Sequence, residues 1–280
     1  MKKIICIILV ASLTITSIPL KANAKSNEIL YVDGYEFNVT ENNGKKTTVY
    51  TTLENGDKIY ATLDKSMEEI SLEFIDYPQN MLGIGIGMPE NTKYDVTATV
   101  LTSENINAKV INTKTKESIN IKEYRGEVTA QNIIFIPIAE YLLTASIVAA
   151  LQALLMATAT IVVAGVIFYA ASKVMPELRA KQPSIKYYKA TLQNGNVYIG
   201  AELTTAQAAS YLKANMTSTY PNNIFAYSST YALSICNVVS PIHASIGPEK
   251  HGEEGYYSHY HPRKDWTFAR TNRYYNHCWY

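Results

Sequence analysis

Residues 141–172 carry no charged side chain, and this run restricts the fold of the chain more than any other sequence feature. It consists mainly of Ala, Ile, Val and Leu and exceeds the ~20 apolar residues with which a helix crosses a bilayer. Ala149, Ala153 and Ala157 give a smooth face suited to close approach of another helix. We therefore predict a hydrophobic transmembrane or translocation segment over 133–172, as one helix or a helical hairpin. The alternative is a long buried helix in a soluble fold.

The N-terminus has the three parts of a secretory signal peptide. Two lysines at the start are followed by an apolar run over 4–18, and residues 22–24 read Ala-Asn-Ala, a small-x-small cleavage site. We predict a signal peptide over 1–24, so that the protein is exported and then secreted or membrane-associated. Cys236 and Cys278 remain in the mature chain, where a disulfide and two separate buried thiols fit the sequence equally well.

The region before the apolar run alternates apolar and polar residues with the period of two that is typical of strands. Asn-Gly pairs at 43–44 and 55–56 lie between such segments, and both residues tolerate the positive φ angles of tight hairpins. We predict an N-terminal antiparallel all-β domain over 25–130. Its last strands are expected at 95–101, 107–112 and 118–124.

The region after the run predicts a linker over 173–183 and a small α+β domain over 184–280. The expected domain starts with a hairpin over 187–200 that turns at Asn194 and Gly195. Thr204 or Thr205 can cap a helix that runs to Ala214. A strand at 223–227 and a helix from 229 to about 238 are expected to follow.

Charge is divided unevenly between the two halves. Residues 25–130 contain eleven Lys and Arg against seventeen Asp and Glu, a net charge of −6, whereas residues 173–280 contain eleven against six, a net charge of +5. A basic C-terminal half is suited to a polyanionic partner. The plainer reading is an ordinary soluble surface, because net charges of this size are common.

All five histidines lie at or after His243. If residues 256–261 and 272–280 are strands, alternation places His259 and His261 on one face and His277 on a face of the second strand. Antiparallel pairing would then bring the three rings together, with Arg273 nearby. His243 and His251 lie among Pro, Gly and Ser and are expected to face solvent.

Two chemistries suit such a cluster. Three neutral imidazoles can hold a catalytic zinc, with Glu253 or Glu254 as general base. Alternatively no cofactor is needed, and a histidine acid and base activate the ribose 2′-hydroxyl of RNA. The predicted catalytic residues are His259, His261, His277 and Arg273, and the predicted substrate-binding residues are Arg263, Lys264, Arg270, Tyr257 and Trp279. The plainer alternatives are a surface strand and a structural metal clip.

The tail reads Gly-Tyr-Tyr-Ser-His-Tyr-His-Pro and then His-Cys-Trp-Tyr. With the signal peptide, front domain and Ala-rich segment, it resembles a family of secreted toxins of Gram-positive bacteria, whose C-terminal domains are similar to those of polymorphic toxins. The similarity covers roughly the last third, and the front matches only in layout. It implies a toxic domain directed at competing cells and countered by a cognate immunity protein, with His259, His261 and His277 at the motif positions.

The leading functional prediction is an exported toxin whose C-terminal domain cleaves nucleic acid, RNA before DNA, through the histidine cluster. The second is a membrane-permeabilising toxin that acts through the Ala-rich segment. The third is a membrane-anchored envelope protein with a ligand-binding domain and no catalysis. The expected partners are therefore an immunity protein, a membrane and RNA.

Overall fold

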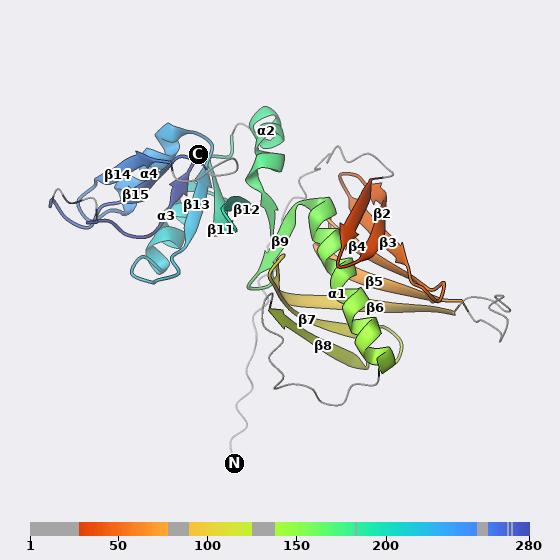
Figure 1. The fold of residues 1–280 in the computed structure, drawn as a ribbon. Coiled ribbons are helices and arrows are strands. Elements are labelled where there is room, and N and C mark those ends of the chain that lie inside the picture. The colour runs from red at the N-terminus through yellow and green to blue at the C-terminus, as the bar shows by residue number, and fades with distance from the viewer. Residues whose placement is uncertain are drawn as a thin grey trace, which may run out of the picture.

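The computed structural model describes residues 28–77, 90–124, 138–182, 184–250, 257–267, 269 and 271–280. The predicted signal peptide lies outside these residues and stays a prediction. Within the described part, sixteen strands form one hydrogen-bonded mixed sheet, and four helices accompany it (Figure 1).

The front of the sheet is an antiparallel meander of eight strands. Both predicted Asn-Gly turns are confirmed: Asn43 Oδ1 accepts the backbone N–H groups of Lys45 and Lys46, each at 2.8 Å, and Gly56 has φ +91°. The strands are β1 (Ile29–Val32), β2 (Tyr35–Asn42), β3 (Lys46–Thr52), β4 (Lys58–Asp64), β5 (Glu69–Asp76), β6 (Glu90–Leu101), β7 (Asn105–Asn112) and β8 (Ser118–Tyr124).

Helix α1 (Ile138–Thr158) forms the first half of the uncharged run and packs on strands β1 to β4 (Figure 1). Leu151 and Leu154 are buried in one core with side chains of these strands, and the small residues Ala149 and Ala153 are fully buried there as well. In the part of the chain that the structure describes, no helix is long and apolar enough to cross a membrane. The predicted transmembrane helix is therefore wrong, because its apolar side chains fill the core above the chain's own sheet.

The second half of the run forms a hairpin of β9 (Thr160–Val163) and β10 (Val166–Ala170). Helix α1 ends where Ala159 adopts φ +52°, and the hairpin turns at Ala164 and Gly165, both with positive φ. Strand β9 pairs with β6 at Val100 and Leu101, and β10 pairs with β12 (Asn196–Leu203) of the C-terminal half. The predicted multidomain organisation is wrong for this reason: the hairpin joins the strands of both halves into one sheet.

Helix α2 (Ala171–Lys181) occupies most of the segment expected as a linker. Pro176 lies inside this helix, although proline removes a backbone donor there. Val174, Met175 and Leu178 are buried against residues of β11 (Tyr187–Gln193) and β12 in one cluster, and this burial offsets the cost of the proline.

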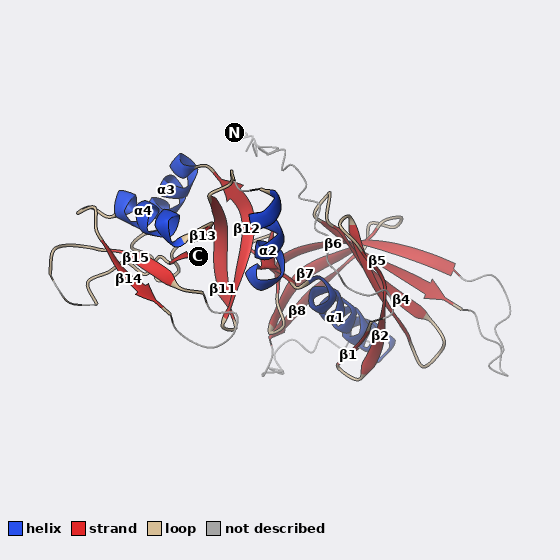
Figure 2. Cartoon of the chain, turned by 90° about the horizontal axis from the view of Figure 1, so that it is seen from above, coloured by secondary structure: helices blue, strands red, loops and turns tan. Residues whose placement is uncertain are grey.

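The C-terminal elements follow the predicted order. The hairpin at Asn194 and Gly195 is confirmed, since both residues have positive φ, and Thr204 caps α3 in a capping box with Gln207. Helices α3 and α4 lie side by side along these strands (Figure 2). The elements are β11 (Tyr187–Gln193), β12 (Asn196–Leu203), α3 (Thr205–Ala214), β13 (Asn223–Ala226), α4 (Ser229–Val239), β14 (Ser245–Glu249), β15 (His259–Pro262) and β16 (Cys278–Trp279).

Candidate metal centre

Strands β13, β16, β15 and β14 lie next to one another in that order and carry the histidine cluster. Strand β15 pairs antiparallel with β16, with His259 opposite Trp279 and Tyr260 opposite Cys278. The predicted antiparallel pairing of the two histidine segments is therefore confirmed, although the second strand is only two residues long.

A buried asparagine fixes the approach to β16. Asn276 is fully buried, and its Nδ2 donates to the backbone oxygens of Leu212 at 3.2 Å and Asn222 at 2.7 Å. The backbone N–H of His277 donates to Asn223 Oδ1 at 2.7 Å. These bonds connect the tail to α3 and to the start of β13, so that the next residue, His277, faces β15.

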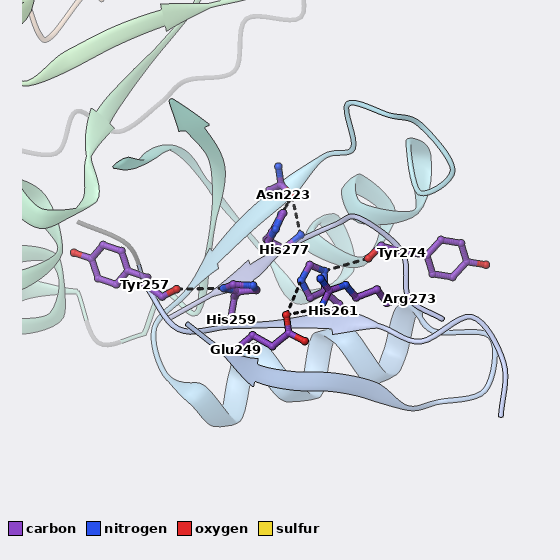
Figure 3. Close-up of polar contacts among 8 residues, drawn as sticks. All are labelled: Asn223, Glu249, Tyr257, His259, His261, Arg273, Tyr274 and His277. Carbon is purple, nitrogen blue, oxygen red and sulfur yellow. Dashed lines mark hydrogen bonds and ion pairs between the residues drawn. The ribbon is translucent and has the colours of Figure 1, made fainter. Parts of the chain in front are cut away.

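The three histidine rings meet on one face of the sheet (Figure 3). Ring centroids are 4.9 Å apart for His259 and His261, 4.9 Å for His259 and His277, and 4.6 Å for His261 and His277. One nitrogen from each ring lies within 4.8 Å of the other two. His259 and His261 are buried, at 0% and 2% exposure, and His277 is half-buried. The three residues could hold a metal ion.

Each ring has its Nδ1 atom next to an oxygen (Figure 3). The distances are 3.3 Å from His259 to the Tyr257 backbone oxygen, 3.1 Å from His261 to the Tyr274 backbone oxygen, and 3.2 Å from His277 to Asn223 Oδ1. A carbonyl oxygen can only accept, so each neutral ring donates its proton from Nδ1. The tautomer with the lone pair on Nε2 is thereby favoured in all three rings.

His261 is held neutral near pH 7. The pKa of His261 is lowered to about 4, mainly by burial and then by the neighbouring Arg273 and His259, whereas Glu249 and the Tyr274 backbone act in the opposite direction. A neutral imidazole is the form that binds a metal ion.

An ion pair lies beside the cluster. Arg273 Nη1 donates to Glu249 Oε2, and the same carboxylate oxygen lies 3.9 Å from His261 Nε2 (Figure 3). Glu249 reaches this face because β14 pairs with β15 and sets it opposite His259. Its side chain is 14% exposed and that of Arg273 is 25% exposed.

The other predicted site residues are more dispersed. Arg263 lies opposite Arg273 in an isolated bridge, and its Nη2 donates to the Thr267 backbone oxygen. Lys264 is exposed, with Nζ 5.6 Å from the ring centroid of Tyr274. Arg270 lies outside the described residues.

Two predicted substrate-binding aromatics pack inside the domain instead. Tyr257 is half-buried and packs edge-on against Phe225 with ring centroids 4.9 Å apart. Trp279 is fully buried, and its ring stacks parallel on that of His277 at 4.9 Å. As placed, Trp279 supports a histidine ring and has no surface on which a base can stack.

The prediction that His243 faces solvent is confirmed, and of the two alternatives left open for the cysteines the structure has the separate buried thiols. His243 is exposed, whereas His251 and the two acids first considered as bases, Glu253 and Glu254, lie outside the described residues. Cys236 and Cys278 are free buried thiols in the core beneath β15 and β16.

Sequence reasoning missed Glu249 and Asn223. Glu249 follows Gly247 and Pro248, and proline argues against a strand, so nothing predicted the pairing that sets it beside the histidines. Asn223 was expected at a strand start, but its contact with His277 joins positions 54 residues apart and leaves no local signal.

Comparison with known protein families, with curated proteins and with solved structures finds no match to this chain. The resemblance to secreted toxins stays a prediction from the tail sequence.

Proposed function

We propose that His259, His261 and His277 bind one zinc ion through their Nε2 atoms, and that this centre belongs to a zinc-dependent hydrolase. The observation that carries the proposal is the set of three Nδ1 atoms, each next to an oxygen acceptor. Metal-binding histidines commonly donate their second ring N–H in this way, which orients the ring and raises its basicity as a ligand.

Zinc fits the donor set. Imidazole suits borderline metals such as zinc, and a site of three protein ligands keeps a fourth position for water, as catalytic zinc sites do. Bonds of 2.0–2.1 Å in a tetrahedral site put ligand nitrogens about 3.4 Å apart, so small ring rotations would close the 4.8 Å cluster. The partial exposure of His277 gives access from that side.

Burial favours a metal over the acid–base pair first considered for RNA cleavage. A histidine acid or base must come within about 3 Å of the reacting proton. His259 and His261 are almost fully buried, so a ribose cannot reach both rings directly. A zinc ion bound by all three rings would instead act on the substrate through its fourth coordination position, so the substrate need not touch the rings.

The test is metal content. Full-chain protein, stripped with a chelator and dialysed against zinc, should hold one zinc per chain by elemental analysis. His259→Ala, His261→Ala and His277→Ala should each lose it, whereas the exposed His243→Ala should keep it. Wild-type protein that retains no zinc, or a cluster variant that retains it fully while folded by circular dichroism, contradicts the proposal.

The predicted export signal and the toxin resemblance supply a biological setting, which we propose on the sequence alone. In that setting the hydrolase acts in a competing cell. Expression of residues 25–280, without the predicted export signal, in a bacterial cytoplasm should then arrest growth only with the histidine cluster intact.

A further inference from the structure

We infer that the Glu249–Arg273 pair makes the proposed zinc centre a phosphodiester hydrolase, in which Arg273 binds the phosphate and Glu249 is the general base. The inference rests on the proposed function, because both residues act on whatever occupies the open position. The sequence suggested Glu253 or Glu254 as the general base. The structure places a different carboxylate, that of Glu249, beside the histidine cluster.

Positive charge at the proposed zinc centre would favour an anionic substrate. Arg263 and Arg273 are direct partners across an antiparallel bridge. Glu249 pairs with Arg273, and Asp265 lies within electrostatic range of Arg263, so each arginine has an acidic neighbour. A zinc ion held by neutral imidazoles would add two further positive charges, so this face would attract a phosphate more strongly than a neutral ester or peptide.

Arg273 has the geometry for a phosphodiester. Its side chain is partly exposed, and a guanidinium has five N–H donors, so its bond to Glu249 does not exhaust it. Planar guanidinium groups bind phosphate oxygens in pairs, which a lysine cannot do. A phosphate at the open position would therefore compete with Glu249 for Arg273 and leave the carboxylate available to accept a proton.

Glu249 is placed outside the ligand set but within reach of a bound water. Its oxygen lies 3.9 Å from His261 Nε2, and the cluster of mutually close ligand atoms contains only the three histidines among the described residues. One water between the carboxylate and the open position would span this gap.

The proposed step balances with water alone. Glu249 takes a proton from a water molecule at the open position, and the water oxygen forms a bond to phosphorus. The bond from phosphorus to the leaving oxygen breaks, and the protonated carboxyl returns the proton to that oxygen. The products are a phosphomonoester and an alcohol, with Glu249 restored.

The experiment measures zinc content and hydrolysis on the same full-chain samples. The probes are bis(p-nitrophenyl) phosphate, an anionic diester, and p-nitrophenyl acetate, a neutral ester. Glu249→Gln should keep its zinc and lose about 100-fold or more in kcat on the diester. Arg273→Lys should raise KM for the diester about tenfold and KM for the acetate by less than twofold. Glu69→Gln, exposed on β5, is the matched control for a lost surface carboxylate.

The outcomes separate the two proposals. A wild-type chain without zinc overturns the proposed function and, with it, this inference. A zinc-loaded chain that does not hydrolyse the diester overturns the inference alone, as does a Glu249→Gln variant within twofold of wild type. Loss of zinc from folded Glu249→Gln would make Glu249 a ligand and overturn its role as base. Equal KM effects of Arg273→Lys on both esters would remove Arg273 as the phosphate-binding group.

Discussion

Tyr188 forms part of the packed layer that also contains Phe225 and Trp279. Its side chain is almost fully buried, and its hydroxyl makes no hydrogen bond to any described residue. Burial, together with the negative charge of Glu202, raises the pKa of Tyr188 to about 12. This phenol is therefore neutral in the folded protein at pH values where it would ionise in the unfolded chain.

A loss of stability between pH 10 and 12 is expected from this residue. An unfolded tyrosine ionises near pH 10. The Tyr188 contribution is thus fully present below pH 10 and is lost as pH rises to about 12, a change of roughly 2 kcal/mol. Urea unfolding at pH 9 and pH 11.5 should show a smaller alkaline loss for Tyr188→Phe. The exposed control Tyr220→Phe should match wild type. An unchanged alkaline loss in Tyr188→Phe would contradict this.

The alternation of residues along the predicted strands indicated the histidine cluster, but not the residues that hold its rings in place. Strand alternation needs only local spacing, and it correctly brought His259, His261 and His277 together. The oxygens beside the rings of His261 and His277 belong to the Tyr274 backbone and to Asn223 at the start of β13, and only the assembled sheet positions them. Burial was likewise not predictable locally, so Trp279 was expected on the surface and is fully buried.

At the scale of elements, α1 stabilises the front of the sheet through one face. Leu151 is fully buried against the strands, whereas Met156 on the same helix is 56% exposed. Leu151→Ala should lower the free energy of unfolding by about 2–5 kcal/mol, because it leaves a cavity in a packed core. Met156→Ala should change it by less than about 0.5 kcal/mol.

Chemical denaturation followed by circular dichroism measures both variants. If the two substitutions cost the same, α1 does not pack on the sheet in solution as it does in the structure.

The uncharged run shows why the element prediction failed. Its first half is rich in Ala and Leu, which favour helices, but its second half reads Thr-Ile-Val-Val, Ala-Gly, Val-Ile-Phe-Tyr. β-Branched and aromatic residues on both sides of a glycine are typical of a hairpin. Hydrophobicity alone is similar in both halves of the run and hides this change. The switch from Ala and Leu to β-branched and aromatic residues indicates that α1 ends near Ala159.

At the scale of the whole molecule, the basic C-terminal half should make activity on RNA depend on salt. If Arg263, Lys264 and Arg273 together neutralise about three phosphates, raising NaCl from about 50 to 200 mM should weaken RNA binding roughly 20-fold. The small diester spans one phosphate and should lose far less. Parallel assays of kcat/KM on both substrates test this, and equal salt dependence would show that the three cations do not bind the chain of phosphates together.

The order and type of most helices and strands in both halves were predictable. The joining of the two halves into one continuous sheet was not. Hairpins such as β11–β12 are encoded by two turn residues, so local chemistry specifies them. The continuity of the sheet depends on the short pairings of β9 with β6 and of β10 with β12, each through two residue pairs. No local pattern specifies such distant pairings, so two separate domains were predicted.

The stacking of Trp279 on His277 also gives the protein a built-in optical reporter. The chain has two tryptophans, and the other, Trp266, is 69% exposed. Replacing Trp266 by phenylalanine would leave Trp279 as the single tryptophan, in ring contact with the cluster. A paramagnetic ion such as Cu²⁺ or Co²⁺ entering there would quench its fluorescence directly, so occupancy could be titrated in dilute solution without a label.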